Sequence, residues 1–318
     1  MKNKKHLFAI ISFALTVVTC GGFVACDNGT KESPNVEDLG VSSLKVAEES
    51  LRFQKISGKD EYRVMGMGTV STLDIVIPET YRDLPVTEIG AYAFENECYI
   101  ETVQMSNNVT VIGDSAFYGC SALTNVKIPN DLTSIGNSAF SGCTSLLNVV
   151  IPNSVTSVGD SAFSGCVSLN GVTIGDGVVS IGKYAFNSCF SLMSVEIPDG
   201  VTSIGNGAFS SCEKLTSIKI PDGVTYIAFD SFMYCSSLKN IVIPNRVTII
   251  YDKAFYGCTS LASVYYKGTV EEWERVLIAG VDDNLTSATR YYYTEEMPTE
   301  AGNWWWYNDN GEIVTTII

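Results

Sequence analysis

Few residues in this chain of 318 have the types and spacing that covalent chemistry needs. Its single histidine, His6, lies in a segment expected to be removed on export, which leaves the mature chain without one. A Ser-His-Asp or Cys-His nucleophile, a histidine-bound zinc ion and an imidazole base are therefore excluded. Carboxylate pairs could still hydrolyse glycosides, but Glu196 is the only acid among the positions predicted to face outward from the sheet. We predict no catalytic residue, no cofactor and no enzyme activity.

Eight of the ten cysteines recur at a nearly constant spacing along the chain. They are Cys98, Cys120, Cys143, Cys166, Cys189, Cys212, Cys235 and Cys258. In an exported protein such a series first suggests disulfides or a metal cluster. Equivalent residues of stacked coils, however, would lie ~4.8 Å apart with parallel Cβ vectors, whereas a disulfide needs converging Cβ atoms ~3.8 Å apart. CxxC zinc spacing is absent from the sequence. The pattern favours a column of buried free thiols, with some disulfides or a metal site as alternatives.

The charge balance excludes further classes of partner. The chain has 20 Lys+Arg against 35 Asp+Glu, a formal net charge of −15, and charged residues make up only 17% of it. Such a surface repels phosphate backbones and anionic lipid. We therefore expect no nucleic-acid partner, and contact with a membrane only through a lipid anchor.

The N-terminus predicts export. A basic start precedes an apolar stretch from Leu7 to Val18, which is shorter than a membrane-spanning helix and typical of a signal peptide. Phe23-Val24-Ala25-Cys26 resembles a bacterial lipobox. Residues 1–25 are thus predicted as a lipoprotein signal peptide, with Cys26 as the lipidated residue. Cys20 is a poorer candidate, and a cleaved signal without lipidation is an alternative.

Residues 26–47 are rich in polar residues and predict a flexible tether between the anchor and the folded body. The protein is expected to be lipid-anchored to the bacterial cell envelope and exposed at the cell surface.

The main organising feature is a repeat with a constant period. Phenylalanines mark it at every 23rd position without interruption, at Phe94, Phe117, Phe140, Phe163, Phe186, Phe209, Phe232 and Phe255. The template is LxxVxIPxxVxxIGxxAFxxC. In one copy Val126 and Ile128 would point inward from a short strand, and Pro129 would end that strand. Gly136 would allow the backbone to turn. A single coil cannot bury these side chains, so the period predicts a solenoid stabilised by stacking.

This repeat resembles that of the BspA-like, or Treponema pallidum-type, leucine-rich repeats, whose pattern is LxxIxIPxxVxxIGxxAFxxCxxL, over about Leu73 to Tyr266. The resemblance implies an α/β-type repeat solenoid with a parallel β-sheet on one face and β-rich end caps. It also implies a bacterial surface or secreted protein, in a family several of whose members are associated with adhesion. Residues 48–293 are assigned to the solenoid with its N-terminal cap. The departures are Met105-Ser106 and Ile174-Gly175 in place of Ile-Pro, and Ala228 and Tyr251 in place of the glycine.

The residues that flank the inward valine of each strand should form the outer face of the sheet. They are mostly small hydroxyl and amide residues, with Val150, Thr173 and Val242 also among them. The predicted ligand contacts are Asn125, Lys127, Asn148, Ser194, Glu196, Ser217, Lys219 and Tyr265. The alternative is a solvated face that binds nothing. The acids Asp176, Asp199 and Asp222 fall in turns after the strands, where turn formation explains them better than calcium binding.

The function that these features favour is a surface scaffold or adhesin for host or bacterial surface proteins or other cells, with glycans as further partners. The first alternative is a carbohydrate-binding surface protein that uses Trp304, Trp305 and Trp306. The second is a structural spacer in the envelope.

The chain ends are predicted to cap the solenoid. Leu51 to Gly68 should form a strand pair over the first coil. After Tyr266, residues 269–278 are predicted as a helix with Thr269 as N-cap, followed by a strand over residues 290–294. Residues 294–318 should form a capping hairpin that turns at Asn310-Gly311.

Overall fold

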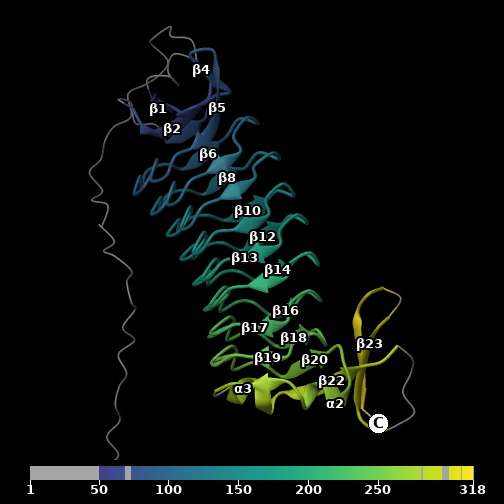
Figure 1. Ribbon diagram of the computed structural model, residues 1–318. Coiled ribbons are helices and arrows are strands. Elements are labelled where there is room, and N and C mark those ends of the chain that lie inside the picture. Colours follow the sequence, from purple (N-terminus) through teal and green to yellow (C-terminus); the bar gives the residue numbers. More distant parts are fainter. Residues whose placement is uncertain (1–49, 69–72, 281, 296–300, 309, 318) are drawn as a thin grey trace, which may run out of the picture. The chain divides into compact units, whose positions relative to one another are not determined.

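The computed structural model describes residues 50–68, 73–280, 282–295, 301–308 and 310–317. The predicted signal peptide, the lipidation site Cys26 and the tether lie outside these residues. Inside them the chain winds through stacked coils, each of which contributes one strand to a face row and one strand to a second row (Figure 1). The predicted repeat solenoid is thereby confirmed, although it contains little helix.

The face row consists of three- and four-residue strands that begin at the same point of each repeat. They are β3 (Asp74–Val76), β6 (Thr102–Gln104), β8 (Asn125–Lys127), β10 (Asn148–Ile151), β12 (Gly171–Ile174), β14 (Ser194–Glu196), β16 (Ser217–Lys219), β18 (Asn240–Ile243) and β20 (Ser263–Tyr266). Their pairing is parallel and one repeat apart, as when Val149 lies opposite Val172. The hydrogen-bonded ladder is interrupted between β8 and β10 and between β14 and β16.

The second row follows the turn after each face-row strand and is also parallel. Its strands are β5 (Leu84–Ile89), β7 (Val111–Ile112), β9 (Ser134–Ile135), β11 (Ser157–Val158), β13 (Ser180–Ile181), β15 (Ser203–Ile204), β17 (Tyr226–Ile227), β19 (Ile249–Ile250) and β21 (Leu277–Ile278). This ladder is continuous from β5 to β15 and starts again at β17, so β15 and β17 are not paired.

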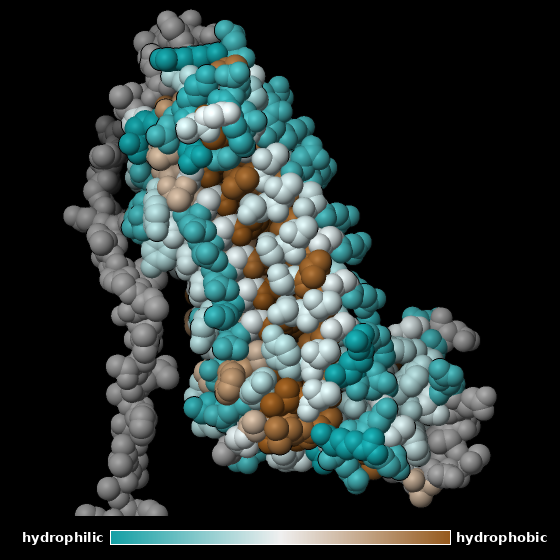
Figure 2. All heavy atoms as spheres, in the orientation of Figure 1, coloured by the Kyte–Doolittle hydropathy of each residue, from teal (hydrophilic) through white to brown (hydrophobic). Residues whose placement is uncertain are grey.

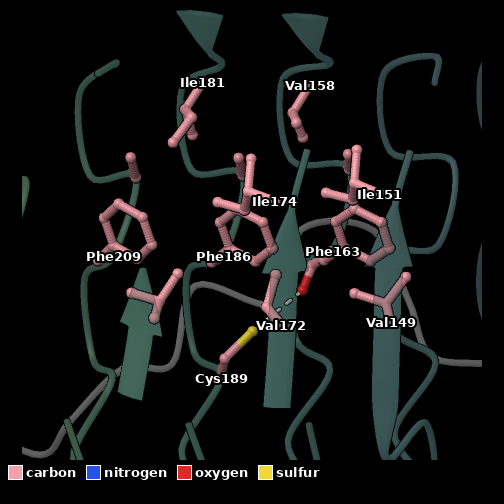
Figure 3. Packing of buried hydrophobic residues seen from close by; sticks show 14 of the residues in the cluster. Val149, Ile151, Val158, Phe163, Val172, Ile174, Ile181, Phe186, Cys189 and Phe209 are labelled. Atoms are coloured by element: carbon pink, nitrogen blue, oxygen red, sulfur yellow. Dashed lines mark hydrogen bonds between the residues drawn. The ribbon is translucent and has the colours of Figure 1, made fainter. Parts of the chain in front are cut away.

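Between the two rows lies a core built from the same repeat positions in every coil (Figure 3). The eight phenylalanine side chains are at most 1% exposed and stack in one column. Neighbouring ring centroids lie 5.1 Å apart at the first step and 5.8 Å apart between Phe209 and Phe232. Each ring therefore covers the next, and the stability of a coil depends on its neighbours.

The repeat glycine serves a different purpose from the one predicted. Gly136 has an ordinary φ, and a Cβ atom on it would lie 2.6 Å from the backbone nitrogen of Asp114 in the preceding coil. The left-handed backbone falls elsewhere, for example at Ser138 with φ 53° and at Gly142 with φ 76°. Glycine is needed because the backbones of adjacent coils approach closely at this point.

The N-terminal cap is the predicted strand pair, in which β1 (Leu51–Lys55) is antiparallel to β2 (Tyr62–Met67). Strand β2 continues the second row by pairing in parallel with β5. A short strand, β4 (Thr80–Tyr81), turns back on β5 through Arg82 and Asp83, both with positive φ. The first coil, from Asp74 to the equivalent Thr102, is five residues longer than the period of 23, and this tight hairpin accommodates the difference.

At the C-terminus the predicted helix over 269–278 is only partly correct. Helix α2 spans Val270–Trp273, and Thr269 caps it reciprocally with Glu272. Leu277 and Ile278 are not helical, because they pair with Ile249 and Ile250 as strand β21 and complete the second row. The pairing site offered by the last coil overrides the local helical pattern.

Three further elements follow, namely α3 (Asp283–Ser287), β22 (Thr289–Tyr293) and the hairpin β23 (Asn303–Tyr307) with β24 (Ile313–Ile317). Strand β22 extends the face row from β20, and β23 pairs with it in parallel over two residues. Strand β24 is antiparallel to β23, and Gly311 in the turn has a φ of 76°. The predicted capping hairpin is present.

Candidate binding face

The outer side of strands β10 to β16 forms an open trough of about 940 Å³. Its floor follows from the alternation of each strand. Val149, Val172 and Val195 are buried, which turns their neighbours outward. The view in Figure 2 shows weakly polar and apolar side chains along the stacked coils, between hydrophilic margins.

Five of the eight predicted contacts, all of them exposed, line the trough: Asn148, Ser194, Glu196, Ser217 and Lys219. Asn125 and Lys127 are exposed on β8, and Tyr265 is half-buried on β20, but these three lie outside the lining. Val242 was expected to face outward, yet it is only 5% exposed. The lining of the trough ends at strand β16.

Two acids that the sequence placed only in turns also line the trough. Asp176 and Asp199 follow strands β12 and β14 and are exposed. The two aspartates occupy equivalent positions of adjacent repeats, and this recurrence was the sequence feature that could have placed them side by side. What the sequence lacked was the direction of these turns, which bend toward the outer face of the sheet.

The charges of the trough are only partly compensated. Lys219 Nζ lies 3.1 Å from Asp199 Oδ1. Partial burial, the largest single influence, opposes the charge on Lys219. The hydrogen bond and charge of Asp199, together with Tyr307 and Asp222, nevertheless raise the pKa of the ammonium group. Between described residues, neither Asp176 nor Glu196 has an ion pair. The trough therefore presents two carboxylates without a basic partner.

The C-terminal hairpin stands next to this face (Figure 1). Tyr307 on β23 is close enough to Lys219 to interact with it electrostatically. Trp305 is fully buried, donates from Nε1 to the Tyr266 carbonyl at 2.9 Å, and packs edge-on against Tyr293 with ring centroids 5.1 Å apart. Trp305 is thus a structural residue of the cap, whereas Trp304 and Trp306 are partly exposed.

The cysteine column has a structural role that the sequence did not reveal. Seven cysteines are buried and free: Cys120, Cys143, Cys166, Cys189, Cys212, Cys235 and Cys258. Each thiol donates to the phenylalanine carbonyl of the preceding coil, as Cys189 does to Phe163 at 3.3 Å (Figure 3). The prediction of buried free thiols is confirmed for these seven. Cys98, in the first coil, is partly exposed and disulfide-bonded, so the prediction of a free thiol is wrong for this residue and the disulfide alternative holds.

Burial also makes these thiols poor nucleophiles. It raises the pKa of Cys120 and of Cys166 to about 12. A thiolate is the reactive form of cysteine, so these two thiols remain protonated and unreactive at neutral pH. Within the described residues no group of three or more His, Cys, Asp or Glu could hold a metal ion, and no helix is long and apolar enough to cross a membrane.

Comparison with known families agrees with this geometry. The model of the BspA type leucine rich repeat region matches residues 70–193 and 156–280, with six copies of the repeat. The chain belongs to this family. This member has the two strand rows and the core column of a repeat solenoid. None of the curated proteins matches the sequence.

Solved structures of similar fold are leucine-rich repeat proteins of bacteria. The T. pallidum leucine rich repeat protein is 22% identical, with 78% of this chain and 86% of that chain covered and a TM-score of 0.43. A protein from Bacteroides ovatus is 24% identical, covering 76% and 77%, with a TM-score of 0.41. The pneumococcal vaccine antigen PcpA is 17% identical, covering 78% and 86%, with a TM-score of 0.44.

Proposed function

We propose that this BspA-type chain is a surface-exposed binding scaffold that takes a protein partner on the outer side of its face row. The observation that carries the proposal is the trough, because it gathers five of the eight contacts expected from sequence into one concave surface. Recognition there would proceed through many weak polar contacts. Small hydroxyl and amide groups such as Ser194 and Asn148 can donate and accept hydrogen bonds at little cost in side-chain entropy.

The lipid anchor belongs to the same proposal. Lipidation at Cys26 would hold the solenoid at the envelope, with residues 26–47 as a spacer between lipid and binding face. A palmitate label that disappears in Cys26→Ser supports this arrangement. A label that survives that substitution would move the anchor to Cys20 or remove it.

The test of binding is a screen of immobilised host-matrix and bacterial surface proteins with two charge-matched double variants. In the first, Glu196→Ala is combined with Ser217→Ala inside the trough. In the second, Glu213→Ala is combined with Ser260→Ala, an exposed pair outside the lining. Loss of binding in the first variant only supports the proposal, and equal loss in both contradicts it.

Two other outcomes favour the alternatives. Binding on a glycan array that is lost in Trp304→Ala would point to a carbohydrate-binding protein acting through the hairpin. The buried Trp305 cannot offer its ring to a sugar. Absence of binding to both proteins and glycans would leave a structural spacer in the envelope.

A further inference from the structure

We propose that the trough binds an extended polypeptide segment with lysine or arginine side chains. This inference rests on the binding function proposed above and names its partner chemistry. It is carried by the charges, the surface and the dimensions of the trough, each of which has an independent basis in the described residues.

The first argument is the charge left over after internal pairing. Four charged residues line the trough, and one pair, Lys219 with Asp199, neutralises itself at 3.1 Å. Asp176 and Glu196 are exposed and lack an ion pair among the described residues. A cationic partner would neutralise these two carboxylates. An anionic partner would be repelled by them and by the net charge of −15 on the chain.

The second argument is the surface between the charges. None of the residues that line the trough is aromatic, so the lining itself offers no ring face for stacking against a sugar. Tyr307, which interacts with Lys219, lies outside the lining. The nearby Tyr265 ring contacts Tyr291 and Trp305 at 5.4 and 5.6 Å and is half-buried. Val150, by contrast, is 62% exposed in the lining. It suits the aliphatic stem of a lysine or arginine whose charged head reaches a carboxylate.

The third argument is length. Strands β10, β12, β14 and β16 lie side by side along the trough, and at ~4.8 Å per strand they span roughly 14 Å. An extended polypeptide advances ~3.3 Å per residue, so about four residues would cross this distance. Alternate residues of such a segment face the same side, which would direct every second side chain to the floor.

The test uses a fluorescent peptide of about ten alternating lysines and serines, and its glutamate–serine counterpart, in anisotropy titrations with the folded chain. We expect binding of the lysine peptide only. The double variant Asp176→Asn with Glu196→Gln should weaken it at least tenfold. The control Asp131→Asn with Glu213→Gln removes the same charge from exposed sites outside the trough and should leave affinity within about twofold.

A second variant gives a prediction of opposite sign. Lys219→Met frees Asp199 from its ion pair, so the lysine peptide should bind severalfold more tightly. A generic contact role for Lys219 would instead weaken binding. Equal effects of the trough and control variants, or no binding of the lysine peptide, overturn the inference. If binding of protein partners still depends on the trough after such a result, the proposed function stands and only this inference fails. A glycan that competes for the trough would show that the ligand is a carbohydrate and not a polypeptide.

Discussion

At the scale of single residues, the buried cysteines connect adjacent coils by hydrogen bonds inside an apolar core. The thiol of each coil donates to a carbonyl one coil back, over 3.0 to 3.3 Å. A thiol is a weak donor and behaves otherwise as a small apolar group. It can therefore act as a second donor to a carbonyl that already accepts from a backbone N–H, as Phe163 does from Cys166, without the desolvation cost of an amide.

This role predicts how the column responds to substitution. Cys189→Ala should lower the free energy of unfolding by about 1–2 kcal/mol, because the Phe163 carbonyl loses a donor and a small void forms. Cys189→Ser should cost less, since its hydroxyl can still donate. Urea denaturation of the two variants measures the difference. An alanine variant as stable as the parent would show that the bond contributes nothing.

At the scale of elements, the break between β15 and β17 coincides with the first departure from the glycine column. A Cβ on Gly205 would lie 2.6 Å from the backbone nitrogen of Lys183, and the next residue of that column, Ala228, has such a Cβ. The Phe209–Phe232 step, 5.8 Å, is also the widest in the ring column. We expect that the Ala228 methyl group separates the two coils along this edge, where the neighbouring residue of the column is still a glycine, whereas Tyr251, whose neighbour is Ala228, leaves β17 and β19 paired.

Ala228→Gly should therefore allow β15 and β17 to form the hydrogen bonds that are missing between them. We expect slower amide hydrogen exchange in β15 and β17 and a gain of about 1 kcal/mol or less, because the restored pairing is offset by the entropy of glycine. Gly223→Ala makes the reverse substitution, glycine to alanine, in the same coil. The added Cβ would lie 3.0 Å from Thr202 Cγ2. If exchange at β15 is the same in Ala228→Gly as in the parent, the methyl group is not the cause.

Helix α3 and its N-cap residue cover the last coil. Their side chains accept the hydrogen bonds that carbonyl groups of the following coil accept elsewhere in the stack. In the coil before the last, Phe232 N–H donates to the Ala254 carbonyl at 2.9 Å. In the last coil Phe255 N–H donates instead to Asp282 Oδ1 at 2.9 Å, and Gly257 N–H to Asn284 Oδ1 at 3.0 Å. Burial, with contributions from Asp252 and Asp230, raises the pKa of Asp282 to about 6.

That pKa predicts a pH dependence of stability. The folded chain holds the Asp282 proton more tightly than the unfolded chain, whose carboxyl has the ordinary value near 3.8. The stabilising contribution is thus complete below about pH 4 and is lost as pH rises through about 6, by on the order of 2 kcal/mol. Asp282→Asn should flatten the curve of unfolding free energy between these values. Asp283→Asn, an exposed neighbour, should leave it as it is.

The sequence predicted what repeats and missed what depends on contact between coils. The register of Phe94 to Phe255 and the inward valines follow from apolar periodicity alone. The reason for Gly136 and the strand at Leu277 depend on the backbone of an adjacent coil, which no local pattern encodes. Asp282 acts on a residue 27 positions away, outside the period. For the trough, the strand residues were predicted, but the turn acids Asp176 and Asp199 were not.

At the scale of the whole molecule, the repeat period itself should decide which deletions are tolerated. Each coil contacts mainly its neighbours, so removal of one complete coil should leave a shorter solenoid. Deletion of Val150–Val172, which is one full repeat, joins Val149 to Thr173 and preserves the alternation of the strand. Deletion of Val150–Gly171, which is one residue shorter, joins Val149 to Val172 and so turns one valine outward or inverts the strand.

We expect the full-repeat deletion to keep a cooperative urea transition with a smaller slope, because one coil less is exposed on unfolding. The shorter deletion should lose several kcal/mol relative to it, because core side chains around one coil are misplaced. Circular dichroism and urea denaturation of the two proteins measure this difference. Equal stability would mean that the coils do not enforce the register, and failure of the full-repeat deletion to fold would show that the solenoid depends on contacts beyond nearest neighbours.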